Sequence, residues 1–156
     1  MHIVILGAGA AGMFAAINAA RRYPQNTYTV LEGTRRPLTK VLISGGGRCN
    51  VTHHCFEPKL LVGKYPRGHK ELLGAFHRFQ PQDTCEWFKR EGVELVTEAD
   101  GRMFPSTHRS RTIADCLLAA AEKAGVILTK GVVIRDVQKT PSGFQLAKSQ
   151  GSDQKT

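Results

Sequence analysis

The sequence predicts an α/β fold with a parallel sheet, on three observations. A short apolar run at residues 2–6 stops at Gly7. Alanine-rich helix formers fill residues 11–22, and a run rich in β-formers follows at 27–32. A strand, a helix and a strand within about 31 residues form a βαβ unit, in which the two strands are parallel and the crossover is right-handed.

Each of these elements has a local cause. The first run, HIVIL, is continuous rather than alternating, which predicts a strand buried on both faces. Alanines are the best helix formers, and Pro24 ends the helix at about Arg22. The run TYTVLE is rich in β-branched and aromatic residues, which favours a second strand.

The remaining elements follow in order along the chain. We expect irregular structure at 33–56 and helices at 69–78, 82–91 and 110–125, with Gly125 as a C-terminal cap. A hairpin at 93–105 should turn at Asp100 and Gly101, a favoured turn pair. We expect a third parallel strand at 126–129 and an antiparallel hairpin from segments 132–138 and 144–148. The predicted domain is 1–148, and the polar segment 149–156 is expected to be a disordered tail.

Composition fits one globular domain. The chain has 156 residues, of which 41% are hydrophobic and 22% charged. No apolar run approaches the roughly 20 residues of a membrane span. No basic stretch precedes the first apolar run, so that run is not typical of a signal peptide. The sequence therefore predicts a cytoplasmic protein without a membrane partner.

The formal net charge of +9 is concentrated in one segment. Residues 33–78 hold nine lysines and arginines against two acidic residues, Glu57 and Glu71. A basic segment of this kind suits nucleic acid, an acidic partner or a phosphorylated ligand. Its aromatic residues lie at helical or core spacing, whereas stacking platforms for nucleic acid need exposed rings. Nucleic acid is therefore not the expected partner.

The segment GAGAAG carries glycines at Gly7, Gly9 and Gly12 and has the context of a dinucleotide-binding fingerprint. It follows the first strand, opens the helix, and has Glu32 at the end of the next strand, 20 residues after Gly12. Gly7 permits the tight turn, Gly9 lets the backbone approach a pyrophosphate, and Gly12 lets helix and strand pack closely. Glu32 is expected to bind ribose hydroxyls and to disfavour the 2′-phosphate of NADP. A Rossmann-like domain that binds FAD or NAD follows.

Three longer segments resemble one family. These are the N-terminal GAGAAGMFAA, the central KVLISGGGRCNVT, and GRMFPSTHRSRTIADCLLAAAEKAGV. Together they resemble the aminoacetone-oxidase-like group of NAD(P)/FAD-dependent flavoproteins, in which SGGGRCN is a signature. The resemblance extends to about residue 147. It implies a Rossmann-like FAD-binding domain with a parallel sheet, crossover helices and a small antiparallel hairpin.

The resemblance also implies which residues hold FAD. The pyrophosphate would lie on Gly7, Gly9, Ala10, Ala11 and Gly12, and the adenosine ribose on Glu32. The pyrophosphate and flavin side would be lined by Lys40, Gly45, Gly46, Gly47, Arg48, Cys49 and Asn50. The backbone of Val133 or Ile134 would meet the adenine. A cation at Arg48 would stabilise an anionic reduced flavin.

Members of that group are much longer than this chain. The resemblance therefore implies the N-terminal, ADP-binding part of an FAD-dependent oxidoreductase, incomplete relative to the family. We expect it to be inactive or weakly active without a C-terminal region, which a separate polypeptide would supply. Catalytic residues and the small-molecule substrate stay unidentified. NAD(P)H is a candidate electron donor for the complete protein.

Other functions remain open on the residues alone. Cys49 and Cys55 have five residues between them within GGRCNVTHHC, one more than the pair of a flavin-linked disulfide reductase, and no glycine precedes Cys55. The cluster Cys49, His53, His54 and Cys55 lacks the second pair of a zinc site, so no metal is expected. A non-catalytic remnant or a basic nucleic-acid-binding domain is the remaining alternative.

Overall fold

The computed structural model describes residues 1–149, which form two compact units. Unit 1 comprises Met1–Thr39 together with the chain from Leu117 onward, and unit 2 comprises Lys40–Cys116. The predicted disordered tail lies, from residue 150 on, outside the described residues. Among residues 1–149 no helix is both long and apolar enough to cross a membrane.

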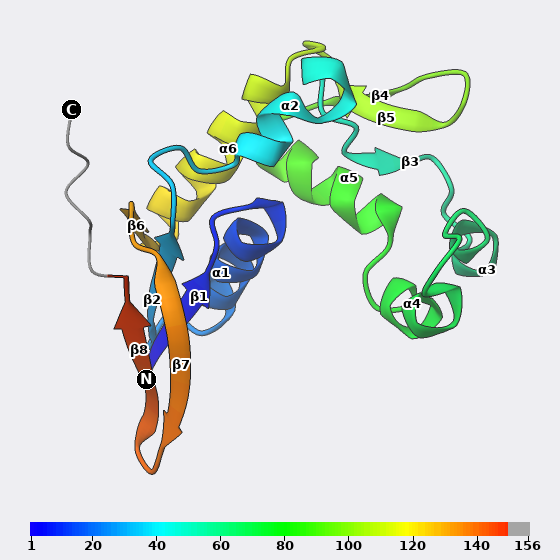
Figure 1. Ribbon diagram of the computed structural model, residues 1–156. Helices are drawn as coiled ribbons and strands as arrows, with labels where there is room; N and C mark the ends of the chain where they lie inside the picture. The colour runs from blue at the N-terminus through cyan, green and yellow to red at the C-terminus, as the bar shows by residue number, and fades with distance from the viewer. Residues whose placement is uncertain (150–156) are drawn as a thin grey trace. The chain divides into compact units, whose positions relative to one another are not determined.

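Unit 1 contains the predicted βαβ unit. It is built from β1 (His2–Leu6), α1 (Ala10–Arg22) and β2 (Thr27–Glu32), followed after unit 2 by β6 (Ile127–Lys130). The three strands form a parallel sheet in the order β1-β2-β6, with Ile3 opposite Tyr28 and Val30 opposite Leu128 (Figure 1). The prediction of an α/β, Rossmann-like fold with a parallel sheet is confirmed.

The core of unit 1 lies between the sheet and α1. Met13, Ala16 and Ile17 on α1 and Val30 on β2 have no exposed surface. Burying the larger side chains, those of Met13, Ile17 and Val30, gives roughly 1.5–3 kcal/mol each, which holds the helix against the strands.

The expectation that β1 is buried on both faces is wrong. Its exposure alternates along the strand, and Val4 and Leu6 are 37% and 50% exposed. Among the described residues β1 pairs only with β2 and is an edge strand of this sheet. A continuous apolar run therefore predicted the strand, but the burial of its second face depends on cover that residues 1–149 do not supply.

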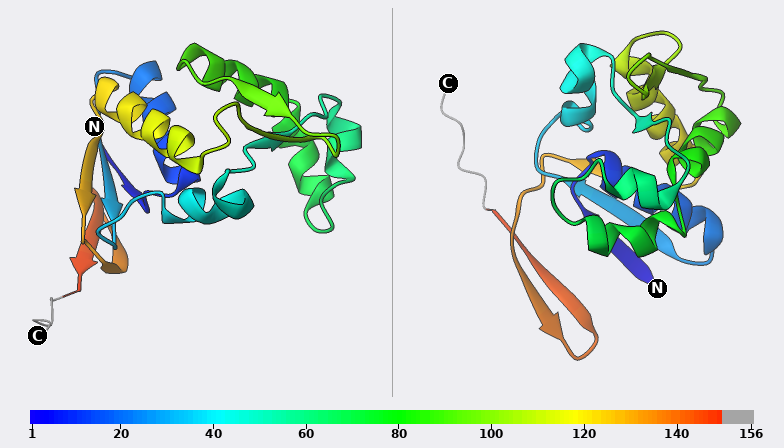
Figure 2. Two further views of the ribbon diagram at one scale, coloured as in Figure 1. Left: turned by 90° about the horizontal axis from the view of Figure 1, so that it is seen from above. Right: turned by 90° about the vertical axis from the view of Figure 1, so that its right-hand side faces the viewer.

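A long antiparallel hairpin completes unit 1. It consists of β7 (Ile134–Thr140) and β8 (Gly143–Lys148), as predicted. Figure 2 shows it projecting beyond the parallel strands. Its base is attached to β2, because Val132 N–H donates to the Glu32 carbonyl at 2.9 Å and Gly131 N–H to the Thr34 carbonyl at 3.0 Å.

Unit 2 has a sheet with shorter strands than that of unit 1, and it contains several short helices. Its antiparallel sheet has the order β3-β5-β4, from β3 (Thr52–His53), β5 (Arg102–Pro105) and β4 (Leu95–Thr97). The helices are α2 (Thr39–Gly47), α3 (Pro58–Val62), α4 (His69–Phe76) and α5 (Pro81–Arg90). Helix α6 (Ser110–Lys123) begins in unit 2 and ends in unit 1, and Gly125 after it has φ +72°, as a C-terminal cap requires.

Two expectations for unit 2 need correction. Residues 33–56 are not wholly irregular, since they contain α2 and β3. The hairpin between β4 and β5 is confirmed, but its turn runs from Glu98 to Gly101, where Gly101 N–H donates to the Glu98 carbonyl at 2.8 Å. Neither α2 nor β3 was predicted, because their sequences contain glycines and histidines, which do not favour regular structure. Tertiary contacts rather than local propensity hold these two elements.

Candidate functional site

The glycine-rich turn after β1 leads into a helix start without a side-chain cap. Gly7 has φ +100°, a conformation that glycine adopts without strain, and its N–H donates to the Leu31 carbonyl at 2.8 Å. Helix α1 then begins at Ala10, with Gly9 as the N-cap and no side-chain capping hydrogen bond. The first N–H groups of α1, which include those of Ala10 and Ala11, lack intrahelical acceptors and carry the positive end of the helix dipole.

The other two glycines of the fingerprint have different roles in the turn. A Cβ added at Gly12 would lie far inside van der Waals contact with the Gly7 carbonyl oxygen and 3.3 Å from Ile5 Cγ2. A Cβ added at Gly9 would meet no atom within 4 Å. Gly12 is therefore required by packing, whereas Gly9 keeps open the space beside the helix N-terminus.

Glu32 is fastened directly to the glycine-rich turn. One carboxylate oxygen accepts from Ala8 N–H at 2.8 Å, and the other accepts from Thr34 N–H at 2.8 Å and from the Thr34 hydroxyl at 2.9 Å. Burial raises the pKa of Glu32, but these hydrogen bonds from Thr34 and Ala8 outweigh it, and the net pKa lies below its usual value. The side chain is therefore an ionised acceptor beside the turn.

The start of the β7 hairpin lies at the same end of unit 1. The Val132 N–H donates to the backbone carbonyl of Glu32, and a Cβ added at Gly33 would lie 3.4 Å from Val133 Cγ2. The Val133 carbonyl accepts from Ser149 N–H at 2.8 Å, and Ile134 pairs with Lys148. Unit 1 thus brings together the turn, Glu32 and the Val133–Ile134 backbone, as expected of the adenosine end of a dinucleotide site.

The SGGGRCN segment lies in unit 2 and has an unusual backbone. Gly45, Gly46, Gly47 and Cys49 all have positive φ, between 56° and 81°. A Cβ at Gly45 would lie 2.8 Å from Asn50 N and 3.1 Å from the Phe104 ring, while Gly46 and Gly47 have open space. The glycines are thus needed for the backbone conformation itself. The contribution of this segment and Lys40 to a cofactor site stays a prediction.

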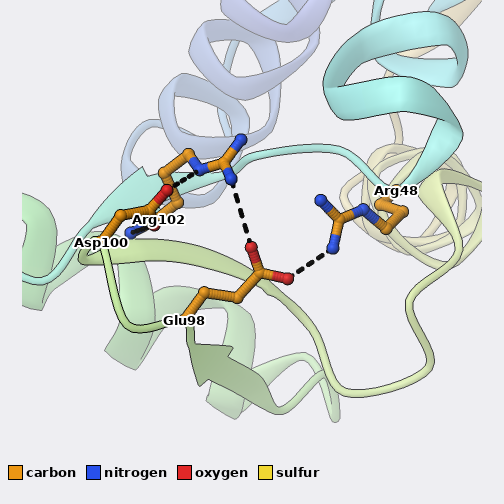
Figure 3. Close-up of polar contacts among 4 residues, drawn as sticks. All are labelled: Arg48, Glu98, Asp100 and Arg102. Carbon is orange, nitrogen blue, oxygen red and sulfur yellow. Dashed lines mark hydrogen bonds and ion pairs between the residues drawn. The ribbon is translucent and has the colours of Figure 1, made fainter.

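Arg48 is part of a charged network within unit 2. Its guanidinium donates to Glu98, whose second oxygen lies 3.4 Å from Arg102, and Arg102 in turn contacts Asp100 at 2.6 Å (Figure 3). The same guanidinium lies 4.2 Å from the centre of the fully buried Phe104 ring. Glu98 and Phe104 were not recognised in the sequence, because nothing in the hairpin pattern singles out a partner 50 residues from Arg48.

The two cysteines of this region are not joined by a disulfide. Cys49 is 6% exposed, and burial raises the pKa of its thiol by more than a hydrogen bond with the Ser44 side chain lowers it. A thiol of raised pKa holds less thiolate, the form that attacks disulfides. The redox-dithiol alternative is therefore not favoured. Within residues 1–149 no group of three or more His, Cys, Asp or Glu side chains is placed to hold a metal ion.

The geometry of unit 1 is compatible with a phosphate at the start of α1 and a polyhydroxylated ring beside Glu32. The helix start offers N–H donors to an anion, and the space at Gly9 admits it. Glu32 offers charged acceptors beside that space. These residues fit the ADP part of a dinucleotide. The fit rests on the free space at Gly9, where an added Cβ would meet no atom within 4 Å.

The chain is similar in sequence to several known proteins. The chain matches the HI0933-like protein Rossmann domain over residues 1–156. It is 30% identical over 143 residues to a ribosomal RNA dihydrouridine synthase of Escherichia coli, covering 92% of this chain and 34% of that protein. It is 27% identical, with the same coverage, to a 3-dehydro-bile acid delta(4,6)-reductase of Clostridium scindens. The chain thus spans about a third of the length of these relatives.

Solved structures share the fold at low sequence identity. The THI4 protein of Thermovibrio ammonificans superposes with a TM-score of 0.59 at 13% identity, covering 93% of this chain and 45% of that one. The Diels-Alderase PyrE3 superposes with a TM-score of 0.53 at 16% identity, covering 97% and 30%. At such identities the likeness supports the fold alone.

Proposed function

Because the chain belongs to the HI0933-like protein Rossmann domain family, we propose that unit 1 binds the ADP part of FAD in a flavin-dependent reductase. The observation that carries the proposal is the uncapped start of α1, open at Gly9 and bordered by the ionised Glu32. The helix start takes the pyrophosphate and Glu32 the adenosine ribose. When bound, a flavin supplies the electrons for reduction, and this chain's residues hold and orient it.

The choice of FAD rests on the resemblance of SGGGRCN to the aminoacetone-oxidase-like flavoproteins. The choice of reduction rests on the relatives. Dihydrouridine is uridine with two hydrogens added across a ring double bond, so a dihydrouridine synthase and a reductase share that chemistry. A carboxylate at the ribose disfavours a 2′-phosphate in this site, so NADPH as electron donor would bind elsewhere.

Glu32→Ala tests the cofactor site. Loss of charge-assisted hydrogen bonds to the ribose, worth about 1.5–3 kcal/mol each, should weaken FAD binding by roughly tenfold or more. The measurement is titration of the purified chain with FAD by calorimetry. Thr34→Val is the matched control, because it removes a hydrogen bond to the same carboxylate and leaves the carboxylate in place. Equal affinity of Glu32→Ala and the parent chain would refute the ribose role.

We further propose RNA as the substrate class, which reverses the expectation drawn from the sequence. The ribosomal RNA dihydrouridine synthases among the relatives motivate this proposal, and unit 2 supports it with a specific observation. Phe56, Tyr65 and Phe79 are 39–41% exposed, so they are not core residues as their spacing suggested. Exposed cations lie among them in the sequence, at Lys59, Lys64, Arg67, Lys70 and Arg78. Exposed rings among cations are the pattern that binds single-stranded nucleic acid.

The triple variant Lys64→Gln, Arg67→Gln and Lys70→Gln tests this surface. Each lost phosphate contact lowers the slope of log affinity against log salt by about 0.7 for a single strand, so we expect a slope lower by about 2. Gel shifts of a short single-stranded RNA across a salt series give the slope. The control triple Lys123→Gln, Lys139→Gln and Lys148→Gln has the same charge change in unit 1 and should leave the slope unchanged. Equal slopes for both triples would reject an RNA surface on unit 2.

A further inference from the structure

Unit 2 contains a small cavity at the N-terminal end of α5. Its volume is about 270 Å³, and its lining combines three aromatic residues with polar side chains. The residues that matter for its chemistry are His53, Tyr65, Phe76, Phe79 and Gln80. They come from β3, the loop after α3, α4 and the start of α5, so segments distant in sequence form one lining.

Two polar atoms in this lining are buried without a partner. Within residues 1–149, neither His53 Nδ1 nor Gln80 Oε1 has a hydrogen-bond partner. At the start of α5 the Gln80 backbone N–H donates to the Asp83 carboxylate at 2.7 Å, in a capping-box arrangement that also turns the Gln80 side chain toward the Asp83 backbone. Buried polar groups are nearly always satisfied in folded proteins, so two in one cavity indicate a missing ligand or water.

The His53 ring is held in place rather than loosely packed. A Cβ at Gly101 would lie 2.5 Å from His53 Cε1, 2.8 Å from Nε2 and 3.2 Å from Nδ1, so the bare Gly101 makes room for the edge of the ring that carries both nitrogens. The β3–β5 pairing of His53 with Arg102 fixes the backbone beneath it. The nitrogen-bearing edge of the ring is therefore packed on Gly101, and Nδ1 is buried there without a hydrogen-bond partner among residues 1–149.

The aromatic walls indicate more than water. Tyr65 and Phe76 lie 5.5 Å apart between ring centres, and Tyr65 and Phe79 are 40% and 41% exposed at the surface. The cavity is several times the roughly 30 Å³ that one water occupies. Water would satisfy the two polar atoms but gains nothing from three rings, whereas a flat ligand with polar edges uses both.

We propose that this cavity binds an unstacked base of single-stranded RNA. A base brings a planar face to the aromatic walls, an N–H donor to Gln80 Oε1, and an acceptor or donor to His53 Nδ1, which serves either way according to its tautomer. The exposed cations Lys64, Arg67 and Lys70, between α3 and the first turn of α4, are the phosphate-binding groups of the same segment. The inference rests on the proposed RNA substrate and adds a subsite for one base.

Free bases test the cavity without RNA. In titrations of the 156-residue chain followed by backbone amide NMR shifts, 1-methyluracil should perturb residues of the cavity lining. 1,3-Dimethyluracil keeps the ring and carbonyls but lacks the N–H donor, and should bind at least tenfold more weakly. His53→Phe and Gln80→Leu should each weaken 1-methyluracil binding at least fivefold. His54→Phe changes the adjacent histidine, which is outside the lining, and should bind like the parent.

The outcomes separate this inference from the proposed function. Equal binding of both methylated bases, no shifts in the lining residues, or parent-like binding by both cavity variants would overturn the base subsite. If the variants unfold, Phe79→Leu, at the exposed mouth, replaces them and should weaken 1-methyluracil binding. The triple variant of Lys64, Arg67 and Lys70 gives a further outcome. If it still binds the base but no longer binds RNA, the base subsite is separate from the surface that binds the phosphates. Base binding by the parent chain with no RNA binding would refute the proposed substrate alone.

Discussion

Gly12→Ala should destabilise unit 1 severely. The added methyl group would overlap the Gly7 carbonyl oxygen, which belongs to the turn between β1 and α1. The clash is with backbone, so no side-chain rotamer relieves it, and either the turn or the helix must move. Overpacking costs about 1–3 kcal/mol where side chains can adjust, and more where they cannot. We expect a loss of at least about 3 kcal/mol in urea unfolding, a large part of the 5–15 kcal/mol typical of a domain.

Gly9→Ala is the matched control and should behave in the opposite way. Gly9 has φ −81° and ψ −178°, a conformation open to alanine, and its Cβ would meet nothing within 4 Å. The variant should therefore keep the parent's stability while placing a methyl group where the pyrophosphate would approach. Parent-like urea unfolding with weakened FAD binding is the expected result. Parent-like stability of Gly12→Ala would show that the helix and strand do not pack as described.

Periodicity and spacing predicted the parallel half of the fold well. The βαβ unit needs only local information, since HIVIL, the alanine-rich segment and TYTVLE each favour one structure and the glycines join them. The position of Glu32 beside the turn follows from the same spacing. The hydrogen bond from Ala8 N–H to Glu32 shows why that spacing places the acid there, because adjacent parallel strands end at the same edge of the sheet.

Burial was predicted less well, because it depends on neighbours that a local pattern does not specify. Val4 and Leu6 are as apolar as Ile3 and Ile5, yet the first pair is exposed and the second is partly covered. Phe79 occupies a helical position in the sequence but lies after the end of α4, where it is 41% exposed. Both errors arose from inferring cover from hydrophobicity alone.

The contacts of Arg48 were the largest omission at the candidate site. The sequence places a cation after three glycines and suggests a cofactor as its partner. The structure gives Arg48 a carboxylate partner, Glu98, and an aromatic one, Phe104, both from the β4–β5 hairpin region. Such pairings depend on how the hairpin folds back on the glycine segment, which spacing does not encode.

Arg48→Glu should therefore destabilise unit 2 itself. It removes a charge-assisted hydrogen bond, worth about 1.5–3 kcal/mol when buried, and a cation–π contact of about 0.5–1 kcal/mol, and it sets two carboxylates against each other. Because the Arg48 and Glu98 side chains are 36% and 29% exposed, solvent screens part of this, and we expect a net loss of about 2–3 kcal/mol in urea unfolding. The exposed Arg109→Glu carries the same charge change and should cost no more than about 0.5 kcal/mol.

If the Arg48→Glu variant also failed to bind FAD, its lower stability could be the cause. A variant that loses both stability and FAD would not show that Arg48 touches the cofactor, because the glycine segment would have moved. Arg48→Met and Glu98→Gln, alone and combined, separate the two roles. If Arg48 serves only the network, Glu98→Gln should weaken the unit by a similar amount, and the pair should show a coupling of about 1 kcal/mol. If Arg48 also binds the cofactor, only the variants that lack the arginine should lose FAD affinity beyond their loss of stability. Additive effects of the two substitutions on stability would show that the ion pair of Figure 3 does not hold the glycine segment.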